Sequence, residues 1–343
     1  MVNRFQIIIF SILILCCTTL HAQFRTYAGE FLKLGVGARS LAMGNTGATI
    51  AEDASAGYWN PAGLSQIQFP SIVGMHEARF DNTVSHDFAA LAFPLGSSGG
   101  ASISVMHIGI SNIKDTRSAL IDANGNGQFD EGDYLDYSKV SSFGNYDWGF
   151  LFSYGQAHDS ILSFGATAKF ILRKLDPTNH ATGFGFDVGF RYMLLPELTL
   201  GAIAEDITTT LLSYSTGTKE LVPPTLKLAG SYQWDIANNG DHILLPAIDV
   251  DLRFENLGSS SEVHLGPISS DFHFGLEYKL KKMVMLRVGY NDLKMFTLGA
   301  GIHLPRLTID YAFQSFSAQD QLGNTHRISF SLSLEEAKWR RKD

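Results

Sequence analysis

The chain has 343 residues, of which 45% are hydrophobic and 17% charged, and its formal net charge is −8. The negative charge argues against nucleic acid as a partner, because the only basic cluster, in residues 338–342, is expected to be a solvated end. Beyond the first 22 residues, no segment offers the roughly 18 consecutive apolar residues that a transmembrane helix needs.

The first 22 residues are typical of a secretory signal peptide. Arg4 supplies a cation, residues 7–15 are almost entirely apolar, and Ala22 is a small residue at the expected cleavage point. A lipoprotein interpretation would acylate Cys16, but the bulky residue before it argues against that cleavage. Because Cys16 and Cys17 are the only cysteines, we expect a mature protein with no disulfide and no cysteine nucleophile.

Residues 23–71 show no alternation of apolar and polar side chains and are rich in small residues. Short helices are expected near 39–43 and 53–57, and Asn60 before Pro61 indicates a helix end and a turn. Fourteen strands, the number predicted below, enclose a lumen wider than side chains alone can fill. We therefore expect this segment to form a plug inside the barrel or across its periplasmic mouth.

Fourteen later segments alternate as β-strands do. In residues 184–192, large apolar side chains alternate with small or charged ones, so that Asp187 and Arg191 share the face opposite the aromatic rings. Rings on the outside and a polar, glycine-spaced face on the inside are typical of a membrane-spanning barrel. The predicted strands are 72–79, 87–95, 101–110, 147–155, 161–173, 183–194, 198–205, 225–234, 243–254, 271–280, 283–290, 295–303, 306–316 and 326–334.

The lengths of the connections support this interpretation. Bacterial barrels have short periplasmic turns and longer extracellular loops. With both chain ends in the periplasm, the four longest connections, 111–146, 206–224, 255–270 and 317–325, all fall on the extracellular side, although the short connection 291–294 does not fit. We predict an all-β fold: a transmembrane antiparallel β-barrel of about 14 strands with a short N-terminal plug segment. A soluble sandwich or barrel is the alternative, but it needs no such asymmetry.

The predicted organisation is a signal peptide at 1–22, a plug segment at 23–71, the outer-membrane barrel at 72–334 and a periplasmic tail at 335–343. Charged residues on the inward face are expected to be paired in the lumen. Because that lumen is polar, we expect Gly189→Ser to be mild. The inward charges are Asp187, Arg191, Asp249, Asp251, Arg253, Glu277, Lys279, Arg287 and Asp310.

The connection 111–146 contains the spacing of a calcium-binding loop. Oxygen-bearing side chains stand at positions one, three, five, seven, nine and twelve, and Gly127 at position six allows a sharp turn. Asp133 at the last position reaches less far than the usual glutamate, and the flanks are not helical. A polar surface loop without an ion is the alternative. The predicted ligands are Asp122, Asn124, Asn126, Gln128, Asp130 and Asp133.

Two motifs in the plug segment resemble a known family. GVGARSLAMG at 35–44 and EDASAGYWNPAGLS at 52–65, followed by alternating strands, resemble the PorV/PorQ family of outer-membrane proteins of Bacteroidota-type bacteria. That family belongs with the FadL-like fourteen-stranded barrels, in which an Asn-Pro-Ala element lies in the plug. The plug here is shorter than in the FadL pattern. The matching residues are Gly35, Gly37, Ala38, Arg39, Asn60, Pro61 and Ala62.

The resemblance implies a non-enzymatic barrel associated with type IX protein secretion, which binds or hands over exported proteins at the outer membrane. Its implied partners are outer-membrane lipid, secreted cargo proteins and components of the secretion system. The alternative is a FadL-like channel for uptake of hydrophobic small molecules, which an apolar pocket behind the plug would favour. A third alternative, a barrel phospholipase, would need a Ser/His pair facing lipid. The sequence shows no catalytic grouping, so we expect no enzymatic activity and no required cofactor.

Overall fold

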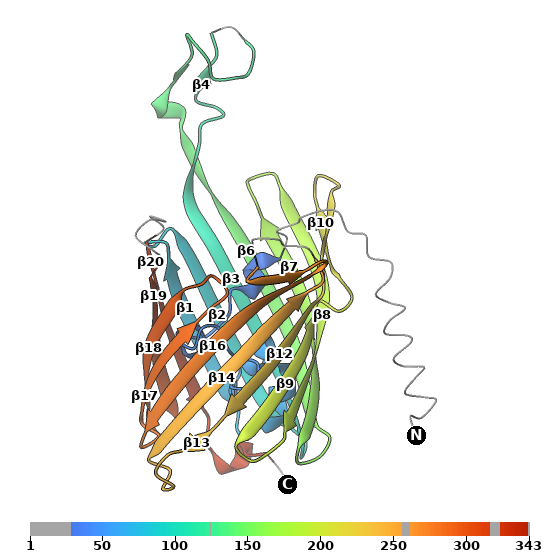
Figure 1. The fold of residues 1–343 in the computed structure, drawn as a ribbon. Coiled ribbons are helices and arrows are strands. Elements are labelled where there is room, and N and C mark those ends of the chain that lie inside the picture. Colours follow the sequence, from blue (N-terminus) through green and yellow to red (C-terminus); the bar gives the residue numbers. More distant parts are fainter. Residues whose placement is uncertain (1–28, 124, 256–260, 316–322, 342–343) are drawn as a thin grey trace, which may run out of the picture.

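The computed structural model describes residues 29–341 except 124, 256–260 and 316–322, so the predicted signal peptide lies outside the described residues. The chain forms a closed antiparallel barrel of fourteen strands, in which β1 (Ser71–Arg79) pairs with both β2 (Val84–Leu95) and β20 (Asn324–Ser333) (Figure 1). In the described part of the chain, no helix is long and apolar enough to cross a bilayer. The predicted fold class is confirmed.

All fourteen predicted strands are present, with ends that differ from the prediction by a few residues. The other barrel strands are β3 (Gly99–Asp115), β6 (Ser141–Ala157), β7 (Leu162–Lys174), β8 (His180–Met193), β9 (Leu198–Glu205), β12 (Thr225–Tyr232), β14 (His242–Arg253), β16 (Ile268–Leu280), β17 (Val284–Tyr290), β18 (Phe296–His303) and β19 (Leu307–Ser315). Two short strands, β13 (Trp234–Asp235) and β15 (Val263–Leu265), extend the sheet at its rims.

In strand β8, the alternating sequence places apolar side chains outside the barrel and charged side chains inside it. Phe184 and Phe190 are each 50% exposed on the outer face, whereas Asp187 and Arg191 are buried inside the barrel. This is the orientation that the sequence predicts, and it follows from the two-residue period of a strand whose outer face must be apolar.

The two ends of the barrel differ (Figure 1). Strands β3 and β6 continue past the rim and carry residues 116–140, which hold the hairpin of β4 (Leu120–Ile121) and β5 (Tyr134–Leu135) and the turn η3 (Tyr137–Lys139). We call this the outer end. The opposite, inner end carries short connections such as 96–98 and 304–306.

The connection 206–224 is not the simple loop that the sequence predicts. Strand β10 (Thr210–Tyr214) pairs with β8 and with β11 (Lys219–Val222), so both strands extend the barrel wall. Residues 206–209 leave the ladder, and Asp206 adopts a left-handed φ of 54°. Pro223 and Pro224 interrupt the facing strand, since proline has no N–H to donate. Because of these interruptions, the alternation in the sequence does not predict β10 and β11.

Residues 29–70 lie inside the barrel (Figure 1). This plug contains the 3₁₀ turn η1 (Glu30–Lys33), the short helices α2 (Ala38–Ala42) and α3 (Ala56–Trp59), and the 3₁₀ helix η2 (Pro61–Gln66). Each helix is too short to be stable alone, so its structure depends on burial against the wall. After β20 the chain forms η5 (Ala337–Trp339) and folds back at the inner end. The expectation of a solvated end is therefore wrong for Arg341, which bonds to the barrel and plug.

Candidate functional site

Inward glycines of the wall form the seat of the plug. A Cβ atom built on any of them would overlap plug atoms, because the plug backbone approaches the strands as closely as a glycine allows. The expected mildness of Gly189→Ser is wrong for this reason, since a side chain there would collide with Asn60. The seat consists of Gly100 against Leu64, Gly155 and Gly165 against Pro61, Gly189 against Asn60, Gly275 against Met43, Gly289 against Gly44, and Gly299 against Ala42.

Arg39 on α2 anchors the first half of the plug. Its guanidinium donates to both oxygens of the fully buried Glu277 on β16, at 3.0 and 2.8 Å, and to the carbonyl of Ile50 at 2.9 Å. Glu277 also pairs with Arg287 at 2.5 Å and with Lys279 at 3.3 Å. A bidentate arginine–carboxylate pair fixes both position and orientation, so Arg39 sets how α2 lies against the wall.

The glycines of the first plug motif also help to fix the first half of the plug to the wall. Gly35 and Gly37 have left-handed φ values of 75° and 83°, which turn the chain on either side of Val36. The carbonyl of Gly37 accepts a hydrogen bond from Arg327 on β20 at 3.3 Å. The next residue, Ala38, is fully buried and donates its N–H to the hydroxyl of Ser329 at 2.9 Å.

The Asn-Pro-Ala element begins η2 and joins it to β8. The side-chain oxygen of Asn60 accepts from the N–H of Ala62 at 3.1 Å, and its amide donates to the carbonyl of Phe190 at 3.0 Å. Pro61 stands at the first helical position, where its missing N–H costs nothing. The three residues therefore cap the helix and bond it to the wall at once.

Several further wall residues bond to the plug, and the sequence gives no signal for which plug group each would meet. Asp249 on β14 accepts from the N–H groups of Gly47 and Ala48, and Thr297 on β18 accepts from that of Gly44. Thr167 on β7 donates to the carbonyl of Gly57. With the contacts above, polar bonds connect the plug to six strands spread around the barrel.

Other inward charges pair with each other along the wall, as the sequence predicts. Lys169 lies 2.7 Å from Asp187 and 2.5 Å from Asp206, and Lys227 pairs with Asp251. Such pairs and their hydrogen bonds lower the large cost of burying a charge. Further pairs along the wall are Arg173 with Asp147, Arg253 with Asp271, and Arg287 with Asp310, whereas Arg191 lies 3.7 Å from Glu52 of the plug.

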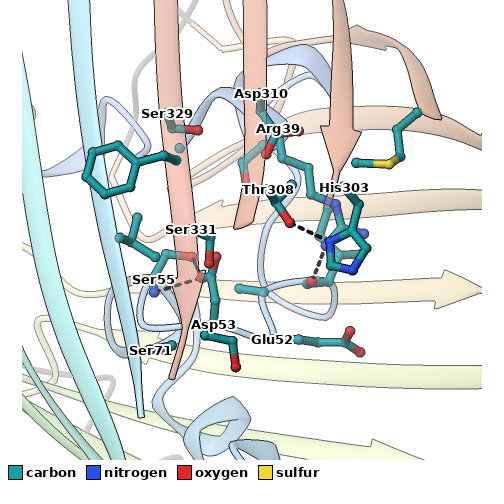
Figure 2. Close-up of a pocket in the computed structure, with 18 of the residues that line it drawn as sticks. Arg39, Glu52, Asp53, Ser55, Ser71, His303, Thr308, Asp310, Ser329 and Ser331 are labelled. Carbon is teal, nitrogen blue, oxygen red and sulfur yellow. Dashed lines mark hydrogen bonds between the residues drawn. The ribbon is translucent and has the colours of Figure 1, made fainter. Parts of the chain in front are cut away.

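A cavity of about 690 Å³ lies between the plug and the wall strands β14, β16 to β20 and β1, towards the inner end. Figure 2 shows Arg39, Glu52 and Asp53 on its plug side and His303 and Thr308 among its wall residues. Apolar side chains from both sides interrupt this polar lining, which is therefore mixed. The apolar contributors include Val36, Ile50, Ile67, Val73 and Phe330.

Apolar side chains of the plug pack against the wall towards the outer end. Phe31 of η1 belongs to a buried cluster with Ile171 of β7, Leu212 of β10 and Val222 of β11. The side chain of Leu32 packs against this cluster. On the outer side of the lumen, this apolar cluster is packed against the guanidinium of Arg173, which lies 5.9 Å from the centre of the Phe31 ring. The inner side contains the mixed cavity, and the residues described above include no catalytic grouping.

The predicted calcium loop folds as a compact exposed turn. The carboxylate of Asp122 accepts from the N–H groups of Gly125 and Gly127, both at 2.6 Å, and that of Asp133 accepts from Ala123 and Asp130 at 2.8 and 3.0 Å. Asn126 contacts Asp130 at 2.5 Å, Gln128 donates its N–H to Asn126, and Asn124 lies outside the described residues. Within the described ranges, no three His, Cys, Asp or Glu side chains are grouped to hold a metal. Calcium binding stays a prediction.

A closed fourteen-stranded barrel with a short plug in its lumen defines a FadL-like fold. Solved structures similar to this chain include the toluene transporter TbuX of Ralstonia pickettii (14% identity, TM-score 0.55, covering 87% of this chain and 98% of that one). The toluene transporter TodX of P. putida (14%, 0.52, 88% and 99%) and a Pseudomonas aeruginosa FadL homologue (10%, 0.52, 88% and 98%) are also similar. No family model and no curated protein sequence matches the chain. Membership of the PorV/PorQ family therefore stays a prediction.

Proposed function

We propose that this protein is a non-enzymatic channel in the outer membrane of a Gram-negative bacterium and that it takes up small hydrophobic molecules. One observation carries the proposal: 87–88% of the chain shares its fold with proteins described as toluene transporters and a monoaromatic hydrocarbon channel. This argument rests on shared fold, so a direct transport measurement must test it.

The interior geometry supports the proposal. A hydrophobic molecule can replace the apolar contacts of Phe31, Leu212 and Val222 with its own, whereas an ion that passes these side chains would lose part of its hydration. The mixed cavity on the inner side of these residues offers such a molecule a binding site near the inner end. The apolar cluster and the cavity together favour the passage of hydrophobic solutes over that of salts.

The test measures uptake of radiolabelled toluene by Gram-negative cells that produce the protein. We expect faster uptake than in cells without the protein. A Leu212→Glu variant should lose this gain, because a buried carboxylate would replace apolar contacts that a hydrophobic solute needs and would disturb the packing around them. Thr216→Glu, in the exposed turn between β10 and β11, is the matched control. Correct assembly of each variant is checked by its heat-dependent gel mobility. Equal uptake with and without the native protein would overturn the proposal.

Secretion-associated function is the second candidate. The motifs at 35–44 and 52–65 support it, and so does the segment 116–140 at the outer end, where Phe129, Tyr134 and Tyr137 are exposed and available to a protein partner. Its proposed partners are secreted cargo proteins and secretion-system components of a Bacteroidota-type bacterium. Pull-down from detergent-solubilised outer membranes should recover them with the native protein and not after deletion of 116–140. Failure to recover such proteins argues against this candidate and leaves the uptake test unaffected.

A further inference from the structure

The segment after the last strand bonds to both the plug and the wall. The guanidinium of Arg341 donates to the carbonyl of Ser65, the penultimate residue of η2, and to that of Gly99 at the start of β3, the latter at 2.8 Å. The backbone N–H of Arg341 donates to the carbonyl of Gln68 at 2.8 Å. One residue therefore connects the end of η2, the residues between η2 and β1, and the start of β3.

The chemistry of these acceptors explains why an arginine is suited to this place. The last carbonyls of a helical turn have no partner within the helix, and a cation near them also interacts favourably with the helix dipole. Ser65 and Gly99 are buried, so unpaired carbonyls there would be costly. The planar, forked guanidinium reaches two carbonyls at once, which a lysine cannot do with the same geometry.

The fastened segment is also part of the cavity wall. Residues 66–69, which leave η2 and lead to β1, line the 690 Å³ cavity, and Glu335 lines it from the other side. Arg306, in the inner turn between β18 and β19, donates to the carbonyl of Glu335 at 3.3 Å. Glu335 therefore borders the cavity, and Arg341 holds residues 65–68, which include part of another border, in place.

We propose that residues 335–341 form a latch that fixes the end of the plug against the barrel wall and so sets the inner mouth of the cavity. Arg341 is the positioning residue of this latch. When the latch is released, residues 65–69 lose their fixed contacts with β3 and the mouth widens, while the remaining plug stays held by Arg39 and Asn60.

Hydrogen exchange of backbone amides in the detergent-solubilised full-length protein tests the latch without any substrate. In Arg341→Gln we expect amides in residues 62–69 to exchange about tenfold faster, because two charge-assisted hydrogen bonds are lost. Amides of β17 should keep their native rates. The matched control is Arg340→Gln, because Arg340 is the exposed neighbour of the same type.

A second arm removes the latch after assembly, so that failure to fold cannot hide the answer. A protease site inserted after Glu336 is cut in the assembled barrel, and the same amides are measured. Faster exchange confined to 62–69 supports the latch. Unchanged exchange after the cut, or equal acceleration in the Arg340 control, overturns it. Because toluene uptake is measured separately, failure of the latch and failure of the transport proposal are distinguishable.

Discussion

The plug, residues 29–70, and the outer loop, residues 116–140, are two long segments outside the barrel strands, and both are rich in glycine. The plug is buried and makes its polar contacts with the wall, as Arg39 does with Glu277. The outer loop is exposed and makes its contacts within itself, as Asp122 does with Gly125. Two glycine-rich segments are therefore ordered in opposite ways, one by contacts with distant residues and the other by contacts within itself.

The difference teaches where each segment obtains its stability. The plug needs partners that are distant in sequence, because its backbone groups are buried and cannot bond to water. The loop needs only neighbouring residues, since water satisfies the rest. Changes to the wall should therefore disturb the plug, whereas changes to the loop should leave the barrel intact. The predictions below test this contrast.

The largest effect is expected for Glu277→Gln. The substitution keeps the shape of the side chain but leaves Arg39, Arg287 and Lys279 without the carboxylate that they share. We expect a loss of about 3 to 5 kcal/mol of folding free energy, as for other broken buried ion pairs. Urea titration of the protein in lipid vesicles measures it. Asp136→Asn, which breaks an exposed pair with Lys139 in the outer loop, should cause no measurable change.

A second test concerns the seat of the plug. Gly289→Ala adds a methyl group that would overlap the backbone of Gly44, and neither chain segment can rotate away. We expect a loss of about 3 kcal/mol, measured by the same titration, because overpacking forces the backbone to shift. Gly230→Ala is the control, since the nearest atom to its new Cβ, in Leu200, is 3.6 Å away. Equal stability of the two variants would contradict the proposed seat.

A smaller effect is expected for Asn60→Ala. The change removes the cap of η2 and the bond to the carbonyl of Phe190. We expect a loss of about 1 to 2 kcal/mol and faster exchange of the amides at 61–66, with the barrel still assembled. Thr216→Ala, in the exposed turn between β10 and β11, serves as the control. Unaltered exchange at 61–66 would mean that the wall and not the cap holds η2.

The smallest effect on the barrel is expected for the outer loop. We propose that Asp122, Asp130 and Asp133 take part in a calcium site, supported by the complete spacing of the motif. Chelator should then speed proteolysis of residues 116–140 in the native protein and have no effect on an Asp122→Ala, Asp133→Ala double variant. Barrel stability should be the same in both. An unchanged cleavage rate in the native protein would leave an ordinary polar loop.

The amino-acid sequence by itself determined the barrel. Strand number, the facing of Asp187 and Arg191, and the side on which the long connections fall all follow from local periodicity and from the need for an apolar outer face. The sequence also singled out Arg39 and Asn60, although not their partners. The strands at 210–214 and 219–222 were missed, because prolines and left-handed residues interrupt the period there.

Only the tertiary structure decided how the lumen is filled. Arg39 and Glu277 are 238 residues apart, and Arg341 and Ser65 are 276 apart, so no local pattern connects them. In the sequence, the inward glycines suggest a lumen with room for larger side chains. In the folded barrel, the plug lies so close to these glycines that a side chain there would overlap it. The physical reason is that alternation specifies a face, whereas close packing depends on which distant backbone is brought against it.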